Sequence, residues 1–592
     1  MNAILLVIDS LDYTRCQHSS SELLPNIKRR AKDGISCENM FSQAPYTEAA
    51  TIALYCGQNT LDYHGYIERF NNAENTLMEC VRNAGYETFF NCFQPQCFPS
   101  SLRRGVDYIM YNRGFDNPSL WTYRFEYYTE KYKKGDFVER DYSQLIRILA
   151  DNFDEWVRFL DDLLKDDISV AMIKKLNSSY NATVVKKAVL EEKKIFENDP
   201  NAYILEIFQK GKNHSLFSIP YFDQIDYEIS DNVEHYYNNE IRAFVRKTRR
   251  MNMSYNILFN NDIITAGLKA LKYYIAGDTD SYTQESALIR NALLMGNNNK
   301  KYGSTCHSLK GQPSFNEHIK TFTEWLDTRK DKSKPFFATI HVDDIHYPEM
   351  YFSYDSDDMS LLEEELNTAK DCLKSRKVSE KGTISLDLSL RYADLKFEQL
   401  MQALEERGII DDTIVFVTAD HGFSYSGYPI RYKFVNTFYL ENFKIPFFII
   451  GKDIKKISEM ALRSSTDIPP TICDVLGIDK PHSFVGDSVL KSINEDRILT
   501  IEYCGGGCPD IDDKQLMIAA FDKDFMVAGL FKLKEGFEKH NVTEIYNLRK
   551  DPLQKKNLVN KMEMGLLNKY LKRIKDRVRN IQKTNEYIIK SF

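Results

Sequence analysis

The sequence predicts an α/β protein whose core is a mixed, mostly parallel sheet sandwiched by helices, and three observations lead to this prediction. Residues 3–8 and 413–419 are short apolar runs, which are typical of buried parallel strands. Residues 395–407 carry a helical pattern just before the second run. Each run is followed by an acid, Asp9 or Asp420, and ligands of open α/β sheets bind at the carboxyl ends of the strands.

Length, charge and cysteine content limit the class of protein. A chain of 592 residues is too long for one core, so two or three lobes are expected. The net charge of -7 and the lack of a long basic run argue against a nucleic-acid partner. The 11 cysteines show no framework spacing, which suits a reducing cytosol. Between Cys504 and Cys508 we expect a glycine turn flanked by buried thiols, with a metal or redox site as the alternative.

Two stretches bear on location. The first apolar run spans six residues, ends on Asp9, and lacks a basic region and a small-residue cleavage site, so it predicts a strand rather than a signal peptide. No window approaches 18 apolar residues, so we expect no membrane span and a cytoplasmic location. The basic helical pattern at 561–581 predicts a solvated amphipathic face, with peripheral membrane contact as the alternative.

The acids at the two strand ends are candidate metal ligands. If the two strands are parallel neighbours, Asp9 and Asp420 converge on one edge of the sheet. Asp420 is followed by His421 and Gly422, and an aspartate with a histidine can hold a divalent metal. A capping aspartate in a turn is the alternative for each acid.

Thr47 is predicted at the N-terminus of a short helix. Pro45 stops any earlier element, Thr47 is a good N-cap, Glu48 suits the first turn, and Gly57 suits the C-terminal cap. The start of a helix favours an anion, and a hydroxyl beside a metal there can act as a nucleophile. Capping alone is the alternative role.

Further short segments carry a family resemblance. They are Asp9-Ser10-Leu11, Leu24-Pro25-Asn26-Ile27, residues 41–47, His64-Gly65, Lys334-Pro335-Phe336-Phe337, residues 341–348, Asp420-His421-Gly422, Lys433, residues 445–450, residues 466–471 with Leu476-Gly477, and residues 544–548 with Asp551-Pro552 and Asn557-Leu558. In this order and spacing they resemble the sulfatase-like branch of the alkaline phosphatase superfamily, over roughly residues 1–115 and 316–560. The resemblance implies an alkaline-phosphatase-like fold.

The resemblance also implies metal ligands, which are Asp9, Asp420, His421 and the oxygen of Thr47. This chain departs from the sulfatase pattern at the nucleophile. Thr47 falls where sulfatases carry the cysteine that becomes formylglycine, and formylglycine cannot form from threonine. Ser10 stands where a second acid would follow Asp9. The remaining set resembles the single-metal site of phosphoglycerol and phosphoethanolamine transferases, such as lipoteichoic acid synthase.

Three other residues are candidates for the catalytic machinery. His346 and His64 are expected to protonate the leaving oxygen or to hold non-bridging oxygens, and Lys433 to offset charge on the phosphoryl group. Solvated turn residues are the alternative for His64 and Lys433. His341 follows an apolar strand, where a satisfied core histidine and a ligand are both open interpretations.

We therefore expect a metal-dependent phosphotransferase or phosphodiesterase that forms a phosphothreonine intermediate at Thr47. Its substrate would be a phosphodiester on a small molecule or on a glycan-linked or lipid-linked precursor of the cell envelope. The alternatives are a hydrolase of phosphate monoesters, phosphonate esters or sulfate esters, and a catalytically silent binding protein. One histidine among oxygen ligands favours manganese or magnesium, with zinc and calcium as alternatives.

Composition divides the chain into four parts. Residues 1–117 and 316–455 form the catalytic core, 118–315 form a helical insertion, and 456–592 form an α+β subdomain. The insertion is expected to cover the active edge and to select the substrate, with a homo-oligomer interface as the alternative use. Residues 351–381 are expected to form a loop with a helix.

Overall fold

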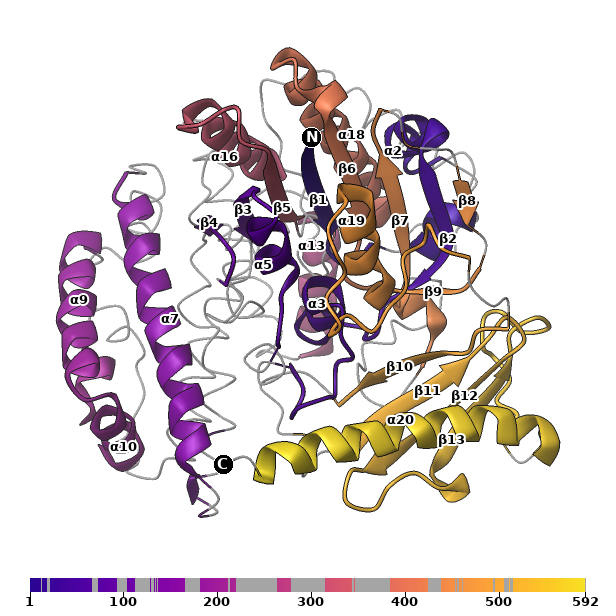
Figure 1. Ribbon diagram of the computed structural model, residues 1–592. Helices are drawn as coiled ribbons and strands as arrows, with labels where there is room; N and C mark the ends of the chain where they lie inside the picture. The colour runs from indigo at the N-terminus through magenta and orange to yellow at the C-terminus, as the bar shows by residue number, and fades with distance from the viewer. Residues whose placement is uncertain are drawn as a thin grey trace.

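A nine-stranded sheet lies at the centre of the structure, which is a computed structural model (Figure 1). The structure describes the following residues: 1–11, 13–18, 22–66, 73–92, 104–111, 128, 132–133, 135, 137–165, 181–210, 213–219, 263–277, 315–342, 345, 384–423, 438–452, 454, 457–459, 461–492, 496–504, 511, 515–559 and 561–590.

The strands of this sheet are arranged so that β1 lies near its middle. Their order is β4 (Tyr108–Tyr111), β3 (Glu87–Cys92), β5 (Phe336–Val342), β1 (Asn2–Ile8), β6 (Thr413–Thr418), β7 (Lys444–Ile450), β2 (Ile35–Phe41) and β8 (Ile457–Glu459), and β9 (Arg463–Ser464) pairs with β2. β7 runs antiparallel to both of its neighbours, and the other pairings are parallel. The prediction of a mixed, mostly parallel sheet is confirmed.

The central strands read as continuous apolar runs because both faces of the sheet are covered. Every residue of β1, β5 and β6 is buried. The covering helices form two groups in mutual contact (Figure 1). One group contains α3 (Thr47–Cys56), α5 (Leu77–Asn83) and α19 (Ile468–Leu476), and the other contains α2 (Pro25–Arg30), α16 (Phe315–Thr328) and α18 (Ile384–Glu406). A short helix, α1 (Tyr13–His18), contacts β7.

The carboxyl-terminal part adds a second, antiparallel sheet with a long helix beside it, as the sequence predicted. The strands run in the order β10 (Leu499–Tyr503), β11 (Gln515–Phe521), β12 (Phe525–Lys532) and β13 (Val542–Asn547). Helix α20 (Met564–Lys590) lies along this sheet and buries Tyr570, Ile574 and Ile581 against it (Figure 1). The Lys/Arg-rich segment is therefore amphipathic in the expected sense.

The predicted insertion contains helices that stand to one side of the central sheet (Figure 1). They are α7 (Glu139–Leu163), α9 (Ala182–Asn198) and α10 (Pro200–Lys210), whereas a further helix, α13 (Ile263–Ala276), is not part of this group and is drawn near the middle of the picture. α7 and α9 pack side by side, and Lys193 of α9 pairs with Asp154 of α7 at 2.7 Å. The boundaries and the role of this insertion stay predictions.

Several sequence-based expectations fall on other parts of the chain. Residues 351–381, His346, Lys433 and Cys508 lie outside the described residues. Within the described part of the chain, no helix is both long and apolar enough to cross a membrane.

Candidate active site

Asp9 and Asp420 meet at the carboxyl edge of the sheet because β1 and β6 are parallel neighbours. Val7 of β1 lies opposite Thr418 of β6, so each acid follows two residues after a paired position. Both carboxylates are buried, at 0% and 1% exposure. The parallel pairing expected from the two strand ends is confirmed, and it brings two buried acids close together.

Ser10 holds both acids in place. Its backbone has a φ of 58°, in the left-handed region that residues with side chains rarely adopt. In this conformation its N–H donates to Asp420 Oδ1 at 3.1 Å, and its hydroxyl donates to Asp9 Oδ1 at 2.6 Å. Backbone strain of this kind concentrates at functional sites, where the surrounding structure enforces it.

Thr47 reaches the same acids from the first turn of α3. Its hydroxyl donates to Asp9 Oδ2 at 2.9 Å, and the residue is buried. The prediction that Thr47 is the N-cap was wrong, because Tyr46, in extended backbone, occupies that position and the helix begins at Thr47. The Thr47 hydroxyl therefore faces Asp9 instead of closing the helix end. Gly57 ends α3 in the left-handed region, as predicted.

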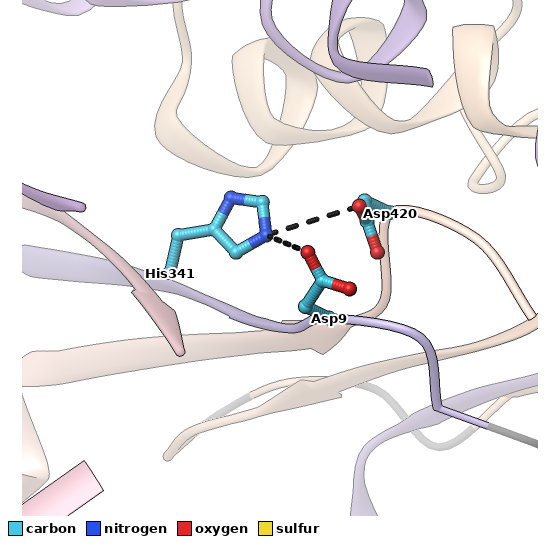
Figure 2. A group of neighbouring side chains, drawn as sticks. All are labelled: Asp9, His341 and Asp420. Atoms are coloured by element: carbon cyan, nitrogen blue, oxygen red, sulfur yellow. Dashed lines mark ion pairs between the residues drawn. The ribbon is translucent and has the colours of Figure 1, made fainter. Parts of the chain in front are cut away.

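His341 enters the cluster from the end of β5, on the other side of β1. It pairs with Val7 in the sheet register, so its ring is near the edge where the acids lie. Its Nε2 lies 3.6 Å from Asp9 Oδ2 and 4.0 Å from Asp420 Oδ2, between the two carboxylates (Figure 2). One ligand atom from each of these three residues lies within 4.8 Å of the others, which is close enough to hold one metal ion.

His421 presents a second imidazole to the same acids. Its Nε2 lies 3.8 Å from Asp9 Oδ1 and 3.6 Å from Asp420 Oδ2. Its Nδ1 lies 2.7 Å from the carbonyl oxygen of Gly422, which only accepts, so Nδ1 carries the proton in that hydrogen bond. The neutral ring then turns the lone pair of Nε2 toward the carboxylates, which is the tautomer that a metal ligand needs.

Gly422 lets the chain after β6 pass close to the segment that precedes β7. A Cβ at this position would lie 2.2 Å from the carbonyl oxygen of Glu441, and the N–H of Gly422 donates to the carbonyl of Asn442 at 3.0 Å. Only glycine fits this approach. The glycine of the Asp420-His421-Gly422 segment is thus required by packing, and it fixes where the His421 side chain begins.

The electrostatics of the cluster favour a cation. Burial, together with the charge of Asp9, raises the pKa of the Asp420 carboxyl above its ordinary value. Asp420 Oδ1 accepts backbone hydrogen bonds, whereas its buried Oδ2 accepts none from the described residues. Two carboxylates and two imidazoles form a donor set for a divalent metal, and a cation there would relieve the repulsion of the acids. The residues therefore fit a divalent metal ion, which is the class of cofactor that the sequence led us to expect.

His64 lies on loop 60–66, which follows α3. Tyr63, His64 and Tyr66 have left-handed backbones, with φ of 51°, 66° and 48°. The N–H of His64 donates to Asn585 Oδ1 of α20 at 2.7 Å, and the hydroxyls of Tyr46 and Tyr66 are hydrogen-bonded to each other. These contacts hold the loop between α3 and α20. Catalytic roles for His64, and for His346 and Lys433 outside the described residues, stay predictions.

The fold and the buried acid–histidine cluster define an α/β protein with a mixed, mostly parallel sheet and a candidate metal site at the carboxyl edge of that sheet. The chain belongs to the sulfatase family, whose model matches residues 1–259 and 266–478.

Individual relatives are distant. An arylsulfatase of Clostridium perfringens is 26% identical over 305 residues, which is 46% of this chain and 60% of the relative. A Δ4,5-hexuronate-2-O-sulfatase of Bacteroides thetaiotaomicron is 23% identical over 205 residues, 31% of this chain and 40% of the relative. The matches thus span less than two thirds of either relative. A solved structure of a predicted sulfatase, yidJ, from Bacteroides fragilis has a TM-score of 0.51 and 11% identity, covering 99% of this chain and 97% of that one.

Proposed function

We propose that the protein is a metal-dependent hydrolase of a phosphate ester in which Thr47 is the nucleophile. The observation that carries the proposal is the hydrogen bond from the Thr47 hydroxyl to Asp9 within the acid–histidine cluster, at 2.9 Å. The relatives are named sulfatases, and this favours hydrolysis over the transfer reaction that the sequence analysis put first. The residue itself favours phosphorus over sulfur, because threonine cannot become formylglycine.

The proposed reaction has two steps. The Thr47 hydroxyl loses its proton as its oxygen attacks phosphorus in line with the leaving group, the bond from phosphorus to the leaving oxygen breaks, and one proton is taken up by that oxygen. Water then attacks the phosphothreonine and releases Thr47. A divalent metal held by Asp9 and Asp420 would lower the pKa of the Thr47 hydroxyl and offset the charge of the ester. Within the cluster, Asp9 positions the Thr47 oxygen and Ser10 positions Asp9.

The test is a screen of chromogenic phosphodiesters, phosphomonoesters, phosphonate esters and sulfate esters with each candidate metal. Thr47→Ala should lower kcat by at least about a thousandfold, because it removes the attacking oxygen. Thr51→Ala is the matched control. Thr51 is buried one turn further along α3. Among the described residues, its hydroxyl donates only to the backbone oxygen of Glu48, at 3.2 Å.

Three results bear on the proposal. Mass spectrometry after acid quenching should find the phosphoryl group on the peptide that contains Thr47. Full activity in Thr47→Ala would remove Thr47 as nucleophile. A preference for sulfate esters over every phosphate ester would remove the substrate class.

Transfer to a second hydroxyl is the other candidate reaction. A phosphothreonine can be resolved by an alcohol as well as by water, and the set Asp9, Thr47, Asp420 and His421 resembles transferases that form such an ester. Adding glycerol or a sugar alcohol to the phosphodiester assay would separate the two reactions. Transfer predicts a phosphorylated acceptor at the expense of free product, and hydrolysis predicts no such acceptor. A substrate on a glycan or lipid precursor belongs to this second proposal.

A further inference from the structure

We propose that His341 is a ligand of the metal in this site and that Tyr55 positions it for that role. The inference rests on the proposed function, because it takes the metal as given. It goes beyond that function by assigning a coordination position to His341, which the sequence left open between a ligand and a core histidine, and by assigning a task to a residue of α3 remote from Thr47.

His341 is placed where its ring nitrogen can serve as a metal ligand beside the two carboxylates. Its Nε2 lies between the carboxylates of Asp9 and Asp420, at 3.6 Å and 4.0 Å, with its ring fully buried (Figure 2). A cation placed between the carboxylates would lie next to this nitrogen. His421 approaches the other oxygen of Asp9, and the two imidazoles both approach Oδ2 of Asp420.

In the sulfatase pattern a second acid follows Asp9, and in this chain Ser10 stands at that position. His341 supplies a donor in place of that acid. The hydroxyl of Ser10 donates to Asp9 Oδ1 at 2.6 Å and lies 3.4 Å from His421 Nε2, so it orients other ligands. An imidazole in place of a second acid beside Asp9 keeps the number of donors but removes one negative charge. With two carboxylates, the site balances a divalent cation without excess charge. Two nitrogens also favour zinc or cobalt over magnesium and calcium.

Tyr55 supplies the contact that turns the ring the right way. Its hydroxyl lies 3.1 Å from Nδ1 of His341, on the side of the ring away from the acids. When Nδ1–H donates to Tyr55 Oη, the lone pair of Nε2 points at the acids, as it does in His421. The same helix, α3, thus contacts Asp9 through Thr47 and His341 through Tyr55. In the opposite tautomer, Tyr55 donates to Nδ1, and Nε2–H donates toward the acids without a metal.

The experiment measures metal binding directly. Metal-free protein is titrated with Zn²⁺, Co²⁺ and Mg²⁺ against a chromophoric chelator. We expect Tyr55→Phe to weaken Zn²⁺ and Co²⁺ binding about 10-fold and His341→Ala to weaken it by about 100-fold or more, with a smaller effect on Mg²⁺. Tyr13→Phe is the matched control, because Tyr13 is a buried tyrosine of the same core that donates to Glu38 at 3.2 Å, away from the cluster.

A spectroscopic reading separates ligation from packing. In the Co²⁺ protein, each bound histidine should give one strongly shifted, solvent-exchangeable N–H proton in the NMR spectrum. We expect two such signals, one lost in His341→Ala and the other in His421→Ala. Circular dichroism of each metal-free variant checks that the fold is retained, and Tyr55→Phe tests the inference even if His341→Ala fails to fold.

The outcomes separate the two proposals. A wild-type protein that binds none of these three metals, nor Mn²⁺ or Ca²⁺, would remove the metal-dependent function itself. If the wild-type protein binds metal, and His341→Ala binds it with the same affinity and keeps both N–H signals, the ligand assignment is overturned and the proposed function still stands. Unchanged Zn²⁺ affinity in Tyr55→Phe, with the N–H signal of His341 in its wild-type position, would overturn the role of Tyr55.

Discussion

Two clusters of buried acids in this protein differ in what faces them. In the candidate active site, Asp9 and Asp420 face the imidazoles of His341 and His421. At the junction with the C-terminal helix, Glu502 and Asp62 face the guanidinium of Arg577.

In the second cluster, one arginine pairs with both acids. Arg577 donates to both oxygens of Glu502, each at 2.6 Å, and lies 2.8 Å from Asp62 Oδ1. Glu502 also accepts the backbone N–H of Leu61 at 3.0 Å. A fixed arginine satisfies acids permanently, whereas imidazole nitrogens that point at acids form a donor set for an added cation. Both clusters contain buried acids, but the cluster of Glu502, Asp62 and Arg577 is a structural joint between the C-terminal helix and the rest of the protein, whereas the other cluster is a candidate binding site.

The largest effect is expected from breaking the joint. Arg577→Met keeps most of the side-chain volume but leaves Glu502 and Asp62 buried without their arginine, so the free energy of unfolding should fall by about 3–5 kcal/mol. Urea unfolding measures it. Lys575→Met on the same helix is the control, because its pair with Glu538, at 2.6 Å, lies in solvent and should contribute little to stability. Equal losses of unfolding free energy in the two variants would mean that the buried ion pairs of Arg577 stabilise the fold no more than an exposed pair does.

A third site has one buried acid, Asp394 of α18, and it lies between these two cases because backbone N–H groups donate to it. It accepts from Asn26 and Ile27 at the start of α2, at 3.0 and 2.9 Å. Burial nevertheless raises the pKa of Asp394 to about 6. Since the folded pKa exceeds the ordinary 3.8, its contribution to stability is present below about pH 4 and is lost as the pH rises through about 6.

This loss should amount to about 3 kcal/mol between pH 4 and pH 7, and Asp394→Asn should remove it from the pH profile of unfolding. Glu398→Gln on the same helix should change the pH profile of unfolding in the opposite direction, because Glu398 contributes stability that is lost as the pH falls. Burial raises the pKa of Glu398, but the hydrogen bonds from Arg30 outweigh burial and keep the pKa below its ordinary value. An unchanged profile in Asp394→Asn would contradict the assignment.

The smallest change in stability is expected at the active site itself. Asp420→Asn removes the repulsion from Asp9, and its amide can donate toward the acids and rings that Oδ2 now faces. The metal-free variant should therefore be more stable than the metal-free wild type by about 1–2 kcal/mol, while its metal affinity collapses. Thermal unfolding with and without Zn²⁺ measures both. A metal-free variant that is less stable than wild type would show that the acids are not strained.

The sequence predicted those parts of the site that follow from local pattern. Asp9 and Asp420 come directly after apolar runs, and parallel strands bring such positions together without further information. Gly57 was recognisable as the end of a short helix. Residues 445–450 and 466–477, two of the segments that carry the family resemblance, contain β7 and α19.

The rest depends on register and on contacts between distant residues. Whether His341 faces the acids is set by its alignment with Val7, which periodicity does not show. The left-handed turn at Ser10 is enforced by Asp420, 410 positions away. The partners of Arg577 come from a loop and a strand far earlier in the chain, and no local signal marks them.

The joint between α20 and loop 60–66 has a practical consequence for anyone trimming the protein for crystallisation. Thr584 and Asn585, close to the end of the helix, contact Asp62 and His64 in the loop that follows α3. A version cut a few turns short would still contain every candidate ligand and the complete central sheet. It would nonetheless release three left-handed residues beside α3, so low activity in such a version would report on the missing tail and not on the chemistry.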